Sequence, residues 1–314
     1  MRTVLLFPGQ SSRYAGALRK LATARPDVVT PLFARAEALL GRRVHEFDQP
    51  GAQRNLEIQI SVFLANQAFA EILRAEGVDG DASIGLSLGE YNHLLHIGAL
   101  AFDDALRLVA ARGAAYDQGP LGAMGAVFPV EEAAVLDAIE RSRALGSVEI
   151  ANFNSPSQFV VAGDRAAVDA VLAILGDEYA AAGVIIDERL PMHCSLFAEV
   201  ADRFRPALAA ATIGVPRTAY VPNVLGRLLD AAAPSRIRHL LVRHVHQPVR
   251  FRQGVEALAE RYPGAAFVEV GPKQVIYGLL TKKWGGFRRF RTDVEETDIA
   301  TSTAALVREL RHAA

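Results

Sequence analysis

The chain has 314 residues, of which 51% are hydrophobic and 22% are charged, so it can bury a large core as one big domain or as a domain with an insertion. Its formal net charge of -1 produces no overall field that would attract nucleic acid or a membrane surface, and we expect neither as a partner. Cys194 is the only cysteine, which excludes an intrachain disulfide and favours a reducing, cytoplasmic compartment. We find no apolar run of the length expected for a secretion signal or a membrane span.

Strands and helices alternate along the chain, which predicts a largely parallel sheet covered by helices on both faces. The apolar run TVLLF predicts a first strand at residues 3–7 that stops at Pro8 and Gly9. Further strands of this sheet are expected at 82–84, 219–223, 266–270 and 289–293. Apolar residues at helical spacing predict helices at 31–40, 56–75, 88–97, 102–118, 196–211, 235–245, 251–261, 274–284 and 299–310.

The pattern changes between residues 122 and 190. Strands are predicted there at 123–128, 148–153, 158–162 and 184–190, with helices at 131–145 and 165–182. The resulting order, βαββαβ, is that of the ferredoxin-like fold. We therefore predict an α/β protein with a hydrolase-like, parallel-sheet large domain formed by residues 1–121 and 191–314, and an inserted ferredoxin-like subdomain formed by residues 122–190.

The stretch from Ile84 to Glu90 contains Gly-x-Ser-x-Gly between a predicted strand and a predicted helix. A serine on such a tight turn has strained backbone angles, and the glycines two places before and after it leave room for the turn. The first amides of the following helix point at the serine, where they can stabilise a negatively charged intermediate. Ser87 is therefore a candidate nucleophile. A serine that caps a helix between two loop glycines is the other interpretation of this short match.

A serine hydroxyl needs a base that takes its proton, and histidine has a pKa that suits this role near neutrality. Among the eight histidines, His93 and His96 are expected to be partly exposed residues of the helix after Ser87. His193 differs from the others because it lies where the inserted subdomain is predicted to return to the large domain. A crevice between two domains is a place where a base could face Ser87, although His193 could also have a structural role.

Six short motifs follow one another along the chain: FPGQ at 7–10, GLSLGE at 85–90, RG at 112–113, ANFNSP at 151–156, PMHC at 191–194 and EVGP at 269–272. In order and spacing they resemble the malonyl-coenzyme A:acyl-carrier-protein transacylases, together with the acyltransferase domains and free-standing acyltransferases of polyketide synthases. The resemblance covers nearly the whole chain. Six ordered motifs are far more specific than the serine motif alone.

The resemblance implies an acyltransferase that works by two-step acyl exchange. Ser87 would attack the thioester of malonyl-coenzyme A with His193 as the base, and the phosphopantetheine thiol of an acyl carrier protein would then take the malonyl group from the serine. The backbone amides of Gln10 and Leu88 would form the oxyanion hole. Arg112 would hold the free carboxylate of the malonyl group as a two-point pair, a geometry that a guanidinium provides and an ammonium does not.

The resemblance further implies that a backbone carbonyl near His244 orients the base, and His244 itself stands where the family usually has glutamine or asparagine. Met192 lies at a position where the family varies side-chain size, so it would crowd a substituent on the malonyl α-carbon and favour malonyl over methylmalonyl. Three departures fall near the expected acyl pocket and its entrance: Leu86 replaces a histidine, Tyr116 replaces a methionine, and SSR at 11–13 replaces Gly-Ser-Gln after Gln10. No metal or bound cofactor is implied, and coenzyme A enters as the thioester substrate.

A basic segment follows the last motif and consists of Lys282, Lys283, Arg288, Arg289 and Arg291. It could dock an acidic carrier protein through long-range attraction, and a solvated loop is the alternative. Reversing the charge of the two lysines would test this interpretation.

Other functional classes stay open at this point. A serine hydrolase or editing thioesterase would use the same Ser87 and His193, although Arg112 argues for a retained carboxylate. A catalytically silent partner within a synthase assembly is a second class, and the substitutions at Leu86 and Tyr116 are its only indication. An acyltransferase with a different, carrier-bound acyl donor is a third. The sequence does not distinguish fatty-acid, polyketide and malonate-decarboxylase contexts.

Overall fold

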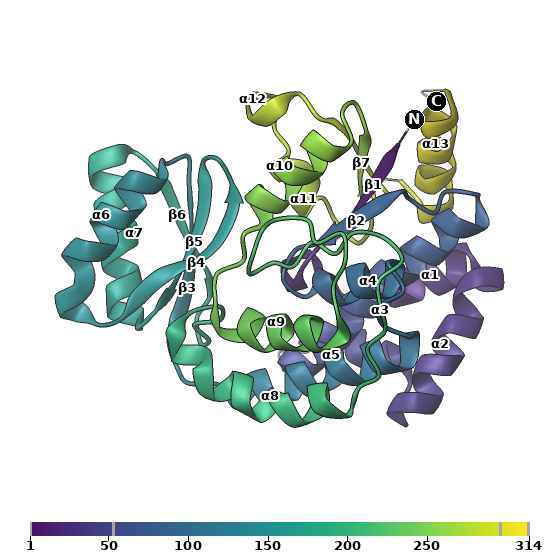
Figure 1. Ribbon diagram of the computed structural model, residues 1–314, viewed down its shortest axis with the longest axis horizontal. Coiled ribbons are helices and arrows are strands. Elements are labelled where there is room, and N and C mark those ends of the chain that lie inside the picture. The colour runs from purple at the N-terminus through teal and green to yellow at the C-terminus, as the bar shows by residue number, and fades with distance from the viewer. Residues whose placement is uncertain (1, 52–53, 295–296, 313–314) are drawn as a thin grey trace.

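The computed structural model describes residues 2–51, 54–294 and 297–312, apart from the side chains of Lys282 and Lys283. The larger part of the chain surrounds a four-stranded parallel sheet in the order β2-β1-β7-β8. A second, antiparallel sheet with its own two helices lies to one side of it (Figure 1). The predicted fold class, an α/β protein with a parallel-sheet large domain and an inserted subdomain, is confirmed.

The strands of the parallel sheet are β1 (Thr3–Phe7), β2 (Ala82–Gly85), β7 (Ala266–Glu269) and β8 (Arg288–Arg291). The α-helices of this part are α1 (Ala17–Ala24), α2 (Pro26–Leu40), α3 (Asn55–Ala75), α4 (Gly89–His96), α5 (Phe102–Tyr116), α8 (Ala198–Ala210), α9 (Pro234–His246), α10 (Phe251–Arg261), α11 (Val275–Leu279), α12 (Lys282–Gly285) and α13 (Ile299–His312). Short 3-10 turns are η1 (Gln10–Ser12), η2 (Val44–Asp48) and η4 (Ser195–Phe197).

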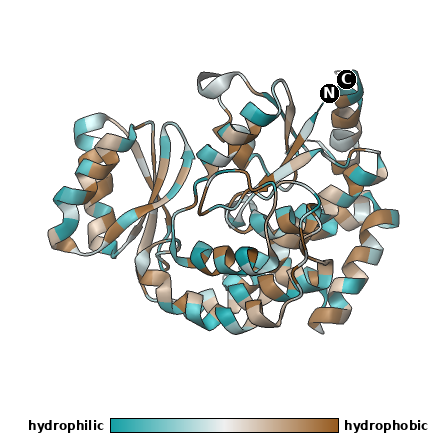
Figure 2. Cartoon of the chain, in the orientation of Figure 1, coloured by the Kyte–Doolittle hydropathy of each residue, from teal (hydrophilic) through white to brown (hydrophobic). Residues whose placement is uncertain are grey.

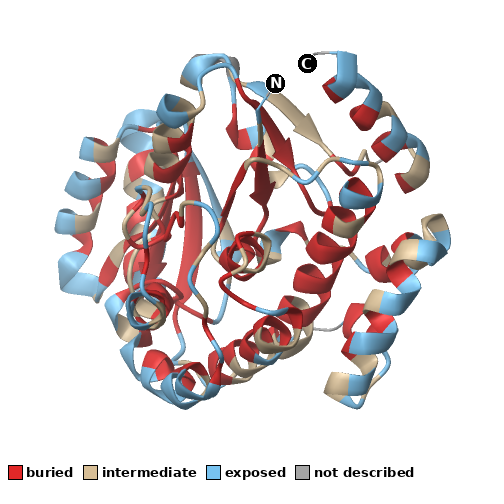
Figure 3. Cartoon of the chain, turned by 45° about the vertical axis from the view of Figure 1, so that its right-hand side comes forward, coloured by how far each residue is buried: buried red, intermediate tan, exposed pale blue. Residues whose placement is uncertain are grey.

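The strand β1 lies in the centre of the sheet because its alternate side chains pack into two separate apolar clusters. Leu5 and Phe7 belong to the cluster that contains α3 and α5, whereas Val4 and Leu6 belong to the cluster that contains residues of α10. Figure 3 shows buried residues running along the central strands and the helix behind them. Burial on both faces explains the uninterrupted apolar sequence of this strand.

The helix α3 is the apolar element that crosses the centre of the large domain. Among the described residues it is the one helix that is long and apolar enough to cross a membrane by length and composition. However, 78% of its most apolar window is buried inside the structure, as in the core helix of a globular domain. By contrast, hydrophilic and hydrophobic residues alternate along the surface helices α8 and α9 (Figure 2).

The second sheet contains β3 (Ala123–Phe128), β4 (Val148–Ser155), β5 (Gln158–Gly163) and β6 (Ala182–Asp187), joined by α6 (Glu132–Ser142), η3 (Arg143–Leu145) and α7 (Arg165–Tyr179). The strands lie in the order β4-β5-β3-β6, and each pair is antiparallel. This is the βαββαβ arrangement predicted from the sequence, and it has an apolar cluster of its own. The boundaries at residues 122 and 190 remain our proposal for the division of the chain.

Backbone hydrogen bonds directly connect the small subdomain with the larger part of the chain. The amide of Phe153, on β4, donates to the carbonyl of Val249 at 2.8 Å, and the amide of Val249 donates to the carbonyl of Ala151 at 2.8 Å. Val249 lies just after α9, so β4 is held beside the segment that carries His244. The small subdomain therefore has a defined position at one side of the site described below.

The prediction of a strand at 219–223 is wrong. The amide of Val221 donates to Nε2 of His93 at 3.0 Å, and the amide of Asn223 donates to Oε2 of Glu90 at 3.2 Å. Buried side chains of α4 thus take the hydrogen bonds that a neighbouring strand would otherwise make, and the segment stays irregular. The expectation that His93 is partly exposed is also wrong, because its side chain is fully buried.

The prediction of one helix over 274–284 is only partly right, since the structure has two short helices, α11 and α12. The backbone leaves the helical region at Leu280, where φ is -74° and ψ is 62°. The helix α1 was not predicted. It begins after Gly16, whose positive φ of 85° is a conformation that glycine adopts without strain.

Candidate active site

Ser87 lies on a sharp turn between β2 and α4, at the carboxyl end of the parallel sheet. Its φ is +49°, in the left-handed region that is strained for a residue with a side chain. A Cβ added to Gly85 would lie 2.0 Å from the carbonyl carbon of Gly89, and one added to Gly89 would lie 2.0 Å from the carbonyl oxygen of Phe7. Both glycines are therefore required, because the turn folds back on itself and on the end of β1.

His193 meets Ser87 across 106 residues of sequence. Its Nε2 lies 2.7 Å from Oγ of Ser87. On the other side of the ring, Nδ1 lies 2.8 Å from the carbonyl oxygen of His244, at the end of α9. Because a carbonyl oxygen can only accept, Nδ1 carries the hydrogen and Nε2 is the free acceptor that faces the serine hydroxyl.

The electrostatic surroundings keep the imidazole of His193 neutral. Burial and, to a smaller extent, the nearby Arg112 guanidinium lower its pKa to about 3, although the hydrogen bond to the His244 carbonyl opposes them. A neutral imidazole that faces a serine hydroxyl can accept its proton. Cys194, the next residue, cannot compete as a nucleophile, because burial raises the pKa of its thiol to about 12.

Two backbone amides predicted to act as an oxyanion hole lie on converging loops. Gln10 begins η1, and Leu88 is the last residue before α4. Neither amide has a hydrogen-bond acceptor among the residues that the structure describes. The loops approach closely, since a Cβ added to Gly9 would lie 2.9 Å from the carbonyl oxygen of Leu86.

Arg112 reaches the same place from α5. Its side chain is only 1% exposed, and its Nη2 lies 3.2 Å from Oγ of Ser87. The Nε and Nη1 atoms have no partner within the described part of the chain, and no carboxylate there lies at ion-pair distance. A buried cation with unpaired donors is costly to maintain. Two free donors beside the serine therefore fit a ligand that carries a carboxylate.

The three remaining side chains predicted to contact the acyl group occupy different surroundings. Sδ of Met192 accepts a hydrogen bond from Nε2 of Gln10 at 3.6 Å, and Met192 is buried. Tyr116 is fully buried, and the Arg112 guanidinium lies 4.2 Å from the centre of its ring. Leu86 packs into the apolar cluster on the other face of the sheet, so its side chain belongs to the core beneath the turn.

Asn223 is a part of the site that sequence reasoning missed. Its Oδ1 accepts the amide hydrogen of Ser87 at 2.8 Å, and its Nδ2 donates to the carbonyl of Gly85 at 2.7 Å. The side chain thus fixes both sides of the strained turn. No sequence signal indicated it, since Asn223 comes from the irregular segment that was predicted to be a strand.

Glu90, on α4, and Gln59, on α3, are two further buried polar residues. Glu90 is fully buried, and burial raises the pKa of its carboxyl group to about 7. It is the last residue of the GLSLGE motif, which could have drawn attention to it. Gln59, on α3, is also fully buried, and neither of its amide atoms has a partner among the described residues.

The basic segment lies on α12 and β8, which precede the last helix of the chain. The side chains of Lys282 and Lys283 lie outside the described residues. Arg288 is exposed, and the Arg289 guanidinium lies 4.2 Å from the centre of the Tyr277 ring. In the described ranges, no group of three or more histidine, cysteine and acidic residues is placed to hold a metal ion.

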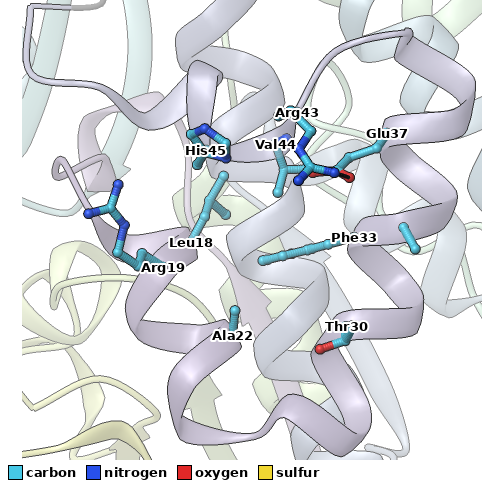
Figure 4. Close-up of a pocket in the computed structure, with 10 residues that line it drawn as sticks. Leu18, Arg19, Ala22, Thr30, Phe33, Glu37, Arg43, Val44 and His45 are labelled. Atoms are coloured by element: carbon cyan, nitrogen blue, oxygen red, sulfur yellow. Dashed lines mark hydrogen bonds and ion pairs between the residues drawn. The ribbon is translucent and has the colours of Figure 1, made fainter.

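A surface cavity of about 360 Å³ lies at a different place, between α1, α2 and η2 (Figure 4). Phe33 and Leu18 form its floor, and Arg43 and Glu37 lie at its rim. None of the residues predicted for the site lines it. The convergence of side chains around Ser87, and not this cavity, therefore defines the candidate site.

Comparison with known proteins identifies relatives of the whole chain. Residues 8–302 match the family model described as acyl transferase domain. The malonyl CoA-acyl carrier protein transacylase of Salmonella typhimurium is 34% identical over 287 residues, which cover 88% of this chain and 91% of the relative. The crystal structure of FabD from Acinetobacter baumannii is 28% identical, with a TM-score of 0.89 and coverage of 100% of this chain and 99% of that one. A malonyl-transacylase solved with its type II PKS acyl-carrier protein is 29% identical, with a TM-score of 0.88 and coverage of 98% and 100%.

Proposed function

The chain belongs to the acyl transferase domain family, and from that premise we propose that it moves a malonyl group from coenzyme A to the phosphopantetheine thiol of an acyl carrier protein. The observation that carries this proposal is the meeting of three side chains: His193 Nε2 at 2.7 Å and Arg112 Nη2 at 3.2 Å from Ser87 Oγ. The first pair supplies a nucleophile with its base. The second supports a role for the Arg112 guanidinium in binding the far carboxylate of a malonyl ester.

In the first half-reaction, Oγ of Ser87 attacks the thioester carbonyl carbon while its proton passes to Nε2 of His193. The tetrahedral intermediate collapses, the carbon–sulfur bond breaks, and the imidazolium returns the proton to the sulfur, which releases coenzyme A. In the second half-reaction, the carrier's thiol gives its proton to His193 as its sulfur attacks the malonyl ester. The tetrahedral intermediate then collapses, the bond between the acyl carbon and Oγ of Ser87 breaks, and His193 returns the proton to Oγ as the malonyl thioester of the carrier leaves.

The oxyanion formed in both half-reactions would accept hydrogen bonds from the backbone amides of Gln10 and Leu88. Their lack of any other acceptor among the described residues supports this role. The main-chain carbonyl of His244 would hold the base in the tautomer that faces the serine. No cofactor enters these steps, since coenzyme A is the substrate.

Arg112 would bind the malonyl carboxylate through two parallel guanidinium donors, Nη2 together with one of the unpaired atoms Nε and Nη1. The ring of Tyr116, over which the guanidinium lies, would hold Arg112 in position. Met192 would limit the room at the malonyl α-carbon. Leu86 would act on substrate choice only indirectly, because its side chain packs in the core. Malonyl is therefore the proposed acyl group, with methylmalonyl as the poorer substrate.

The partners in this proposal are malonyl-coenzyme A and an acyl carrier protein, in fatty-acid or polyketide synthesis. The relatives support this choice, since they include malonyl CoA-acyl carrier protein transacylases, one of them solved with its carrier. The basic segment that includes Arg288 and Arg289 is the proposed docking surface for the carrier. A cytoplasmic location belongs to the same proposal.

The decisive experiment is intact-protein mass spectrometry after mixing with malonyl-, methylmalonyl- or acetyl-coenzyme A. We expect a malonyl adduct on the wild type that Ser87→Ala abolishes, and Arg112→Ala should lose the preference for malonyl. If no coenzyme A ester labels the wild type, the proposal is contradicted. The remaining interpretations would then be an acyltransferase with a carrier-bound donor or a catalytically silent partner. Steady release of free malonate that a carrier protein does not change would instead identify a hydrolase.

A further inference from the structure

The base of the proposed reaction has no carboxylate of its own. Nδ1 of His193 donates to a backbone carbonyl, and no acidic side chain in the described part of the chain lies at ion-pair distance from its ring. When His193 accepts the serine proton, however, it becomes a buried cation next to the Arg112 guanidinium. Two buried like charges destabilise each other, so a negative charge of the protein near the base would stabilise this state in addition to the charges of the substrate.

The ring of His244 contacts both the base and such a charge. It stacks on the ring of His193 with centroids 5.1 Å apart and an angle of 17° between the planes. At the ring edge, Nδ1 lies 3.1 Å from Oε2 of Glu90, and both side chains are 1% exposed. The contact has an ion-pair distance without the alignment of a hydrogen bond, and neither ring nitrogen of His244 has a hydrogen-bond partner among the described residues.

Glu90 is held in this position by contacts that also hold the serine turn. Its Oε1 accepts the hydroxyl hydrogen of Tyr220, and its Oε2 accepts the amide hydrogen of Asn223 at 3.2 Å. The side chain of Asn223 in turn accepts the amide hydrogen of Ser87. The carboxyl group of Glu90 is therefore connected through Asn223 to the turn that carries Ser87, and it also contacts the ring of His244, which stacks on the base.

This inference rests on the proposed function. We infer that His244 is a positioning residue through which the carboxylate of Glu90 stabilises the protonated form of His193. The flat, buried ring contacts both groups and so links the position of the carboxylate to that of the base. A glutamine at this position would keep the main-chain carbonyl that orients His193 but would not supply the stacked ring.

Charged and titratable groups from several elements face this pair within the described residues: Arg112 from α5, Tyr91 from α4 and Tyr220 from the irregular segment. His246, on the same helix as His244, interacts instead with Asp202 and Arg243. Burial lowers the pKa of His244 well below its usual value, so its ring is neutral. Burial also raises the pKa of both tyrosines, which stay protonated.

Glu90 is the member of this group that titrates near neutrality. Burial raises its pKa, and the hydrogen bonds from Tyr220 and Asn223 and the charge of Arg112 offset only part of this effect, so that the pKa is about 7. Above that pH the carboxylate is ionised and can stabilise the imidazolium, and below it the group is neutral. The first half-reaction should therefore speed up as the pH rises through about 7.

The test is the single-turnover rate of malonyl-enzyme formation between about pH 5.5 and pH 9, followed by quenched mass spectrometry. Wild type is compared with His244→Gln and Glu90→Gln, and His246→Gln on the same helix is the matched control. Tyr220→Phe removes one donor from Glu90 without touching His244. Urea unfolding of every variant separates loss of folding from loss of rate.

We expect the wild-type rate to rise through neutrality by roughly tenfold, the factor that one pKa unit at the base represents. Both His244→Gln and Glu90→Gln should flatten that rise, His246→Gln should keep it, and Tyr220→Phe should move it up by about one pH unit. A His244→Gln enzyme that is slower at every pH but keeps the wild-type rise would overturn the inference. If Glu90→Gln does not fold, the pH dependence of the acylation rate in His244→Gln, compared with that in His246→Gln, still tests the inference. Absence of acylation in the wild type would contradict the proposed function instead.

Discussion

Ser87 and Asn223 are 136 residues apart in the chain, yet the amide of Ser87 donates a hydrogen bond to Oδ1 of Asn223 at 2.8 Å. The same asparagine side chain donates to the carbonyl of Gly85. The strained turn that exposes the serine is thus fixed by a side chain from a distant, irregular segment. This arrangement makes the stability of the turn and the activity of the enzyme depend on one amide group.

Asn223→Ala should destabilise the protein by about 2 to 4 kcal/mol, because it leaves one amide and one carbonyl of the buried turn without partners. It should also slow acylation of Ser87. Urea unfolding followed by circular dichroism gives the first quantity, and mass spectrometry gives the second. Asn223→Asp keeps the acceptor for Ser87 but loses the donor to Gly85, so it should fall between wild type and Asn223→Ala. Wild-type stability of the alanine variant would refute the role of this side chain.

Ser87→Gly should be more stable than Ser87→Ala by about 1 kcal/mol, although neither can be acylated at this position. Alanine at a φ of +49° retains the strain of the native serine, whereas glycine adopts this conformation without it. Paired denaturant unfolding curves of the two variants test the difference. Equal midpoints would mean that the backbone relaxes and that the turn is not strained.

Arg112→Lys should reduce the preference for malonyl- over acetyl-coenzyme A by roughly 10- to 100-fold. The ammonium keeps the charge but loses the planar pair of donors, so binding of the carboxylate weakens while transfer of an acetyl group does not. Competition between the two thioesters, read as the ratio of acyl-enzymes, measures the effect. Arg107→Lys, at an exposed position of the same helix, is the control and should keep the wild-type ratio. An unchanged ratio in Arg112→Lys would argue against the carboxylate clamp.

His93 should make the fold sensitive to acid. Burial lowers its pKa from 6.5 to about 3, so the folded state keeps the ring neutral while the unfolded state takes up a proton below 6.5. Its contribution to stability is therefore fully present above about pH 6.5 and is lost as the pH falls toward 3. His93→Gln should lose about 1.4 kcal/mol less per pH unit than wild type within this window. Urea unfolding at several pH values measures the slope, and His45→Gln at an exposed position should leave it unchanged.

Reversing Lys282 and Lys283 to glutamate should raise the apparent KM for the carrier protein and leave acylation by malonyl-coenzyme A unchanged. Charges at the rim of an interface act mainly on the encounter of two proteins, so the effect should diminish at high salt. Arg107→Glu combined with Arg236→Glu changes the net charge equally at exposed positions elsewhere. If both double variants give the same KM for the carrier, docking does not involve the lysines.

Much of this protein follows from local sequence patterns. Strand β1, the βαββαβ order of the small sheet and the tight turn at Ser87 depend on apolar spacing and on glycines within a few residues, so they can be predicted. The predicted return from the inserted subdomain to the large domain directed attention to His193, whereas Arg112 was indicated only by the resemblance to known acyltransferases. Their proximity to Ser87 is then a property of the fold.

The tertiary structure decided the rest, because long-range contacts override local preference. Residues 219–223 have the composition of a strand, but the side chains of His93 and Glu90 take their amides. The clamp made by Asn223 and the ring of His244 stacked on His193 join segments that no periodicity relates. Burial in turn sets the pKa of each group, since it depends on every element that surrounds the side chain and not on its neighbours in sequence.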